Sequence, residues 1–322
     1  MSANFWNSTQ REKWQFNRQS LLDQRRRLLI LEKKMIQNGF IKDYPNINYD
    51  SNMRIYLHNL IIKLGRRLNI RQVALATAEI YVTRFLLKVS LKEINVYLMV
   101  TTSIYVACKI EETPQHIRLV ISEARNLWPE YIPSDISKLA EFEFYLIEEM
   151  DLYLLLHHPY KSLIQIKDFL NENFDEYQLQ LTSSELQHSW SLLNDSYITD
   201  LHLLYPPHIL ALSSIYITIV LKKTLNSIRS DTVESNDKDL HIDDLISLTN
   251  NNPSNEINTN LDSKSDEDTI KINKFMNFLS RNHVNLDQVV ESVQDLINLY
   301  VIWNRYNESN VKKALQYMLL NR

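Results

Sequence analysis

The chain has 322 residues, a formal net charge of −4, two glycines and one cysteine. This length suits one large domain or two ordinary domains, and so few glycines favour a helix-dominated protein with few tight turns. Gly39 and Gly65 are too far apart for a glycine-rich phosphate loop. A single cysteine excludes an internal disulfide or a cysteine-rich zinc site and is typical of a reducing compartment.

Residues 1–44 are expected to form an N-terminal helix and a linker. Apolar residues recur at helical spacing from Ser8 to about Ile36, and Gly39 and Pro45 mark the linker. The first residues are polar and lack the apolar core of a signal peptide. The triplet Arg25–Arg27 is either a solvated face or a docking surface for an acidic partner.

Apolar periodicity and capping signals predict a first domain of five helices in residues 45–156. The third of these helices, Ile94–Glu112, carries no charge before Lys109, and its apolar residues cover every side of a helical wheel. Such a helix is buried all round, as the central rod of a bundle. The residues Ser90–Glu93 before it have capping-box spacing. The expected ranges are 53–68, 72–88, 94–112, 115–127 and 135–156.

A second set of five helices is expected in residues 157–306, followed by a short C-terminal helix in 307–322. The sequence Ser-Ile-Tyr of the first rod, residues 103–105, recurs at 214–216, an offset of 111 residues that indicates an internal repeat. In this register Lys109 falls opposite Val220. The expected ranges are 160–170, 182–198, 208–223, 271–280 and 286–306, and the last helix is 311–320.

Two stretches of the second set need their own explanation. Residues 201–221 are uncharged, but Pro206-Pro207 interrupts them, so we expect a buried helix and no membrane span. Residues 224–269 carry eleven acidic and three basic side chains with almost no aromatic residue. This composition predicts a disordered acidic insertion, which is a plain solvated loop or a phosphorylation target.

The residue patterns favour binding over catalysis. Cys108 lies inside the apolar rod, where a thiol is a small hydrophobic group rather than a nucleophile for His116 or His157. His157 and His158 have no third metal ligand near them in sequence. We therefore expect no catalytic residues, no cofactor and no metal.

A charged group at the end of an apolar rod requires a partner. Lys109 could pair internally with an acidic residue, or it could bind the free backbone groups at the end of an incoming helix together with Glu143. Glu111, Glu112, Phe142 and Leu146 are predicted to belong to the same surface. The sequence leaves both readings of Lys109 open.

The chain resembles the cyclin family in several of these motifs. Ala107–Glu112 is similar to the cyclin-box signature around the kinase-contacting lysine, and Glu143 falls where cyclins carry a kinase-contacting glutamate. Met53-Arg54 and Tyr81–Leu86 are similar to the first and second helices of the first cyclin box. The resemblance implies an all-α fold of tandem five-helix cyclin boxes, with a first box that binds a kinase and in which Arg54 has a structural role.

Within the family the chain is most similar to the C-type cyclins, through Asn4–Trp6, Leu64–Gln72, His158–Tyr160, Asp200–Pro207 and Leu299–Trp303. This implies a nuclear, non-catalytic activating subunit of the cyclin-dependent kinase of the Mediator complex. Its partners would be that kinase and the other subunits of the Mediator kinase module, with no direct contact to nucleic acid. It would act on transcription by RNA polymerase II.

Two departures from the cell-cycle cyclins limit what is carried over. Thr83 stands where those cyclins pair an aspartate with the first-box arginine, and Leu60 replaces the tryptophan of their substrate-docking patch. Two other functions stay open at this point. A DNA-bound general transcription factor with tandem cyclin-like boxes would need a zinc ribbon and a basic face, and a helical scaffold would bind no kinase.

Overall fold

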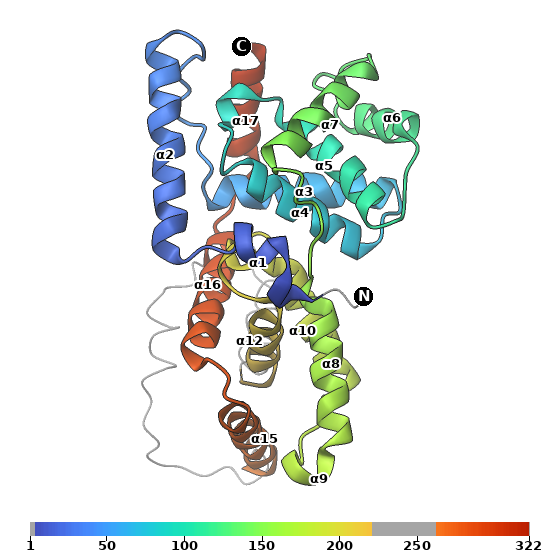
Figure 1. Cartoon of the computed structure of the whole chain (residues 1–322), viewed down its shortest axis with the longest axis vertical. Coiled ribbons are helices and arrows are strands. Elements are labelled where there is room, and N and C mark those ends of the chain that lie inside the picture. Colours follow the sequence, from blue (N-terminus) through green and yellow to red (C-terminus); the bar gives the residue numbers. More distant parts are fainter. Residues whose placement is uncertain (1–3, 221–261, 322) are drawn as a thin grey trace.

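The computed structural model describes residues 4–220 and 262–321, and the regular secondary structure in these residues is helical. Figure 1 shows two groups of helices stacked along the long axis, with helix α2 standing beside the upper group. Most of the predicted insertion, residues 224–261, lies outside the described residues. Among the described helices, none is long and apolar enough to cross a membrane.

The N-terminal segment is not the single helix that we expected. It forms the short helices η1 (Phe5–Asn7) and α1 (Thr9–Trp14), and then α2 (Arg18–Gln37). The break occurs because the Phe16 N–H donates to the Leu203 carbonyl at 2.7 Å, which diverts the backbone toward the second group of helices. Asn17 and Ser20 then form a capping box that restarts the helix.

The first group contains α3 (Ser51–Arg67), α4 (Gln72–Phe85), α5 (Val96–Ile110), α6 (Ile117–Leu127) and α7 (Ser137–Glu149). Four of the five lie close to their predicted ranges. The fifth ends at Glu149, not near 156, because Asp151 and Leu152 have positive φ angles that stop the helix. The predicted capping box at Ser90 and Glu93 is present, but it caps the short helix η2 (Leu91–Glu93), and Asn95 caps α5.

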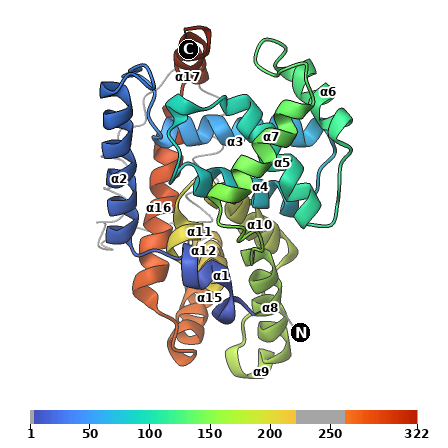
Figure 2. The ribbon, with the colours of Figure 1, turned by 45° about the horizontal axis from the view of Figure 1, so that its top comes forward.

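Helix α5 is the predicted central rod. Its residues are buried except at Tyr105, Lys109 and Ile110, and it contacts the other four helices of its group. Figure 2 shows it enclosed by α3, α4 and α7. An uncharged helix with apolar residues on every side is stable only in such a position, because an apolar face left in water would not gain the free energy of burial.

The second group contains α8 (Pro159–Glu172), α10 (Ser183–Ser196), α12 (Pro207–Val220), α15 (Asp262–Arg281) and α16 (Leu286–Asn304). Helices α9 (Phe174–Tyr177) and α11 (Leu201–Leu204) are short connectors. Helix α12 starts 111 residues after α5 and contacts the other four helices of its group. The two rods are therefore equivalent, which confirms the predicted offset. Helix α15 begins at Asp262, earlier than the expected Lys271.

The C-terminal helix α17 (Glu308–Leu320) returns to the first group, where it packs on α3. Leu315 and Met318 have no exposed surface. In Figure 1 this helix lies at the opposite end of the molecule from α15. The end of the chain thus completes the core of the first group.

Candidate partner-binding site

Lys109 and Glu143 face each other at one end of the central rod. Lys109 Nζ on α5 lies 2.7 Å from Glu143 Oε1 on α7, and the ammonium also lies 4.3 Å from the centre of the Tyr105 ring. The Lys109 side chain is 40% exposed and that of Glu143 is 15% exposed. In the free chain the partner of the rod's terminal charge is therefore internal, and the pair is open to solvent on the lysine side.

The pair keeps Lys109 charged. Burial disfavours the ammonium form, but the contacts with Glu143 and Tyr105 outweigh this effect, so the pKa of Lys109 is raised above its ordinary value. A partly exposed ion pair adds little to stability. The pair can therefore open for a competing ligand at small cost.

The apolar neighbours of Glu143 divide into a core side and a surface side. Leu146 has no exposed surface, so the prediction that it contacts a partner is wrong; it supports α7 from the core. Phe142 is half-buried, with its ring 5.7 Å from that of Phe85. Phe144 is 75% exposed, and Leu152, just after α7, is 73% exposed. Phe144 directly follows Glu143, so an exposed apolar side chain lies next to the pair in sequence.

Glu111 and Glu112 do not join the pair. The Thr77 hydroxyl donates to Glu111 Oε1 at 2.6 Å, and His158 Nε2 lies 3.8 Å from the same oxygen. Burial opposes the charge on Glu111, but these two contacts outweigh it, and its pKa is lowered. In the free chain Glu111 therefore links the two helix groups, and its role in partner binding stays a prediction. Glu112 is exposed and ends α5 with a positive φ of 52°.

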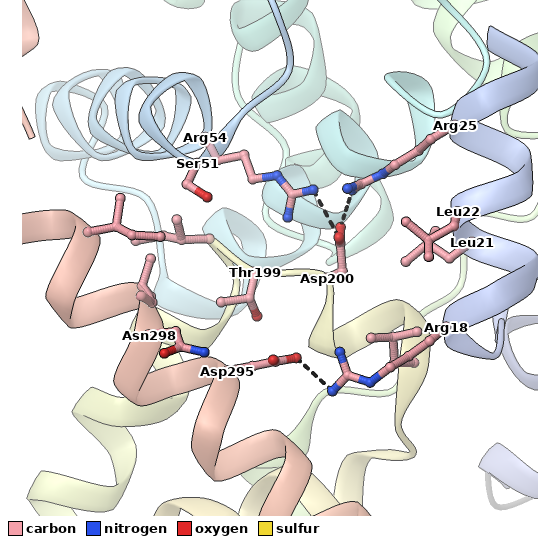
Figure 3. A pocket seen from close by; sticks show the side chains of 14 residues that line it. Arg18, Leu21, Leu22, Arg25, Ser51, Arg54, Thr199, Asp200, Asp295 and Asn298 are labelled. Carbon is pink, nitrogen blue, oxygen red and sulfur yellow. Dashed lines mark hydrogen bonds and ion pairs between the residues drawn. The ribbon is translucent and has the colours of Figure 1, made fainter. Parts of the chain in front are cut away.

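Arg54, whose partner the sequence left unknown, pairs with Asp200 of the second group. Arg54 Nη2 donates to Asp200 Oδ2 at 2.9 Å, and Arg25 Nη2 of α2 donates to Asp200 Oδ1 at 2.6 Å (Figure 3). Both guanidinium groups also lie over the Tyr49 ring, at 4.7 Å for Arg54 and 5.7 Å for Arg25. One carboxylate thus joins the N-terminal helix and both groups of five helices.

A cavity of about 310 Å³ lies beside this carboxylate, between α2, α3, α11 and α16. Arg18 enters it from α2 and is held by Glu291 at 2.9 Å and Asp295 at 3.0 Å (Figure 3). The arginine triplet predicted as one surface is therefore divided, since Arg25 turns into the cavity and Arg26 pairs with Asp23 in solvent. No group of three or more His, Cys, Asp or Glu side chains in the described parts of the chain is placed to hold a metal ion.

The sequence of the chain matches known proteins along its whole length. The sequence profile described as "Cyclin, N-terminal domain" matches residues 20–154. The RNA polymerase II holoenzyme cyclin-like subunit of Scheffersomyces stipitis is 69% identical, and the alignment covers 100% of this chain and 99% of that protein. The protein of the same description in Saccharomyces cerevisiae is 43% identical, with coverage of 99% and 98%.

Two solved structures have a similar fold. One is the CAK complex from Chaetomium thermophilum bound to ATP-gamma-S, with a TM-score of 0.55, 16% identity, and coverage of 91% of this chain and 86% of that one. The other is the yeast TFIIK complex, with a TM-score of 0.52, 21% identity, and coverage of 70% and 97%. At these identities the likeness concerns the fold.

Proposed function

This chain belongs to the cyclin family, and we propose that it is the non-catalytic, activating subunit of a cyclin-dependent kinase that regulates transcription by RNA polymerase II. Support comes from relatives that match the chain from end to end and are described as RNA polymerase II holoenzyme cyclin-like subunits. We infer further that the kinase is the one associated with Mediator, that other subunits of its module are partners, and that the protein acts in the nucleus.

We propose that the kinase binds at the Lys109–Glu143 pair. The kinase carries a mobile helix whose glutamate must pair with the ATP-site lysine before phosphoryl transfer. The ends of a helix present unpaired N–H and C=O groups. The Glu143 carboxylate can accept from the free N–H groups at the start of such a helix, and the Lys109 ammonium can donate to a carbonyl of the backbone that leads into it. Binding would exchange the internal ion pair for these bonds and hold the kinase helix inward.

The observation that carries this proposal is the presence of exposed apolar side chains on and just after the helix that holds Glu143. Phe144 and Leu152 are both more than 70% exposed, although neither gains from contact with water. Aromatic and aliphatic side chains at the centre of an interface supply most of its affinity. The pair would then fix the register of the kinase helix.

We propose that helix α2 adds a contact specific to this kinase. It buries Leu21 but leaves Leu29, Ile30 and Leu31 about half exposed along its outer length. Figure 2 shows α2 running beside the first helix group and α16, with no other described helix on its far side. This is the arrangement expected of a helix that packs against a second protein.

The test is affinity purification of the tagged chain with identification of bound proteins and assay of kinase activity. We expect one cyclin-dependent kinase in the wild-type sample. Lys109→Ala or Glu143→Ala should lower its affinity about tenfold or more, because each removes a charge-assisted hydrogen bond. Helix content by circular dichroism should not change.

The matched control is Lys138→Ala, which removes an exposed ion pair with Glu141 on the same helix α7. It should retain the kinase. If both Lys109→Ala and Glu143→Ala co-purify with an active kinase at the wild-type level, the pair is not the kinase site. If the wild-type chain retains no kinase, the chain is a kinase-independent scaffold.

A further inference from the structure

The cavity beside Asp200 contains two arginines that share one carboxylate. Arg25 and Arg54 each donate one N–H to Asp200, to different oxygens. The Arg54 side chain is 11% exposed, that of Asp200 16% and that of Arg25 28%. The three groups together therefore hold one excess positive charge at a largely desolvated position.

The two guanidinium groups still have unused donors. A guanidinium carries five N–H groups in a planar fork. Arg25 Nε is buried and has no hydrogen-bond partner among the described atoms. Because Nε is out of reach of water, a ligand in the cavity would be bound by the terminal Nη groups of the two forks.

The charges around Arg25 also favour an additional anion in the cavity. Burial and the neighbouring charge of Arg54 lower the pKa of Arg25, and the attraction of Asp200 does not fully offset them. A second anion beside Arg25 would balance the charge. Arg18 does not need it, because Glu291 and Asp295 already hold that guanidinium.

The forks of Arg25 and Arg54 are already fixed in place. Both rest on the Tyr49 ring and both are anchored by Asp200. A ligand that binds such groups does not have to order two long side chains, so less affinity is lost in binding. Figure 3 shows the two guanidinium groups converging on one side of the cavity.

We propose that this cavity binds the phosphoryl group of a phosphoserine or phosphothreonine in a partner polypeptide. A phosphoryl group has a charge near −2 and three acceptor oxygens, which two arginine forks can take up bidentately. Ser51 also lines the cavity and carries a hydroxyl donor, whereas the Thr199 hydroxyl already donates to the Ser196 carbonyl. A partner's carboxylate would bring less charge and one acceptor oxygen fewer.

The remaining lining indicates that the phosphoryl group is attached to a chain. Leu21, Leu22 and Leu204 form an apolar wall, and Ile198, Leu299 and Ile302 extend it. A cavity of about 310 Å³ is larger than a phosphoryl group requires, and its apolar side suits the carbon atoms of a peptide. Free phosphate would leave that wall in contact with water.

The test uses the full-length chain immobilised and exposed to three degenerate peptide libraries with fixed central phosphoserine, serine or glutamate. We expect retention of the phosphoserine library about tenfold above the other two, and a loss of about tenfold in Arg25→Gln. That variant leaves Asp200 and Arg54 as a balanced pair, so it should fold. Arg26→Gln, which changes the adjacent exposed arginine, is the control and should bind like the wild type.

Several results would overturn the proposal. These are equal retention of the serine and phosphoserine libraries, equal retention of the glutamate library, or undiminished binding by Arg25→Gln. Inorganic phosphate that displaces the library at the same concentration as a free phosphopeptide would show a site for a small anion instead.

If Arg25→Gln does not fold, Arg25→Lys takes its place, because lysine keeps the positive charge but lacks the planar guanidinium fork. Retention of the phosphoserine library at the wild-type level by Arg25→Lys would then contradict the proposal. Since no kinase is present, a failure here leaves the kinase proposal untouched.

Discussion

Arg54 and Asp200 are 146 residues apart in sequence, and their side chains are 2.9 Å apart in space. Arg54 lies on the first helix of the first group, and Asp200 lies at the start of α11 in the second group. The arginine therefore does not take its partner from its own group of helices. Arg25 from a third segment completes the contact.

Asp200→Asn should destabilise the protein strongly. The change leaves two neighbouring, largely buried cations without an anion, and removal of one partner of a buried pair costs about 3–5 kcal/mol. Thermal or urea unfolding followed by circular dichroism measures the effect. Asp23→Asn, which removes an exposed pair with Arg26, should change stability by about 0.5 kcal/mol or less. Equal midpoints for Asp200→Asn and wild type would show that the contact has no structural role.

Phe144→Ala should weaken kinase binding without loss of stability. The ring is 75% exposed in the free chain, so its removal creates no cavity in the core. Truncation of an aromatic side chain at an interface centre costs about 2 kcal/mol or more of binding free energy. Surface-bound titration with the purified kinase measures this. Tyr317→Ala on α17, where the side chain is 65% exposed, should have no effect on binding.

Glu111→Gln should make the free energy of unfolding depend less on pH in the acidic range. The pKa of Glu111 is lower in the folded chain than its ordinary value of 4.5, so the carboxylate stabilises the fold above that pH. This contribution is lost as the pH falls through the folded-state pKa. The variant should therefore be about 1 kcal/mol less stable than wild type near neutral pH, and the difference should disappear on acidification.

Melting temperatures measured between about pH 7 and pH 3 test this dependence. Glu112→Gln is the control, because Glu112 is the adjacent exposed acid. It should follow the wild-type curve. A difference between Glu111→Gln and wild type that stays constant with pH would assign the effect to packing rather than to charge.

Cys108 should be inert in the folded chain. Burial raises the pKa of its thiol to about 11, so at pH 8 on the order of one thiol in a thousand is ionised. Ellman's reagent should release no colour from the native protein and one equivalent from the denatured protein. Rapid reaction of the native protein would mean that α5 is not the buried rod described above.

The helices of the two groups could be predicted because their signals are local. Apolar periodicity predicted the rods α5 and α12, and α10 begins at a capping box of Thr182 and Glu185, at the start of the range expected for it. The predictions were wrong where a contact between residues far apart in sequence determines the backbone conformation. The N-terminal helix breaks at Phe16 because of a bond to Leu203, a residue that nothing near Phe16 indicates.

In the candidate sites too, residues marked by a local sequence signal could be predicted, and residues that depend on contacts distant in sequence could not. Lys109 could be chosen from sequence because a charge at the end of an apolar helix is unusual. Asp200 could not be recognised as the partner of Arg54 and Arg25, since the contact depends on how three separate segments pack. Leu146 was misassigned because helical spacing alone does not tell which apolar residues of α7 face the core and which, like Phe144, face solvent.

The position of α17 sets the order in which this protein can mature. Leu315 and Met318 fill the core beside α3. When residues 45–156 have left the ribosome, these two side chains have not yet been synthesised, so the core of the first group is still incomplete. The first group of helices can close only after α17 has been synthesised. A chain truncated before residue 308 would therefore expose apolar surface on α3, and we expect quality-control proteases to remove it.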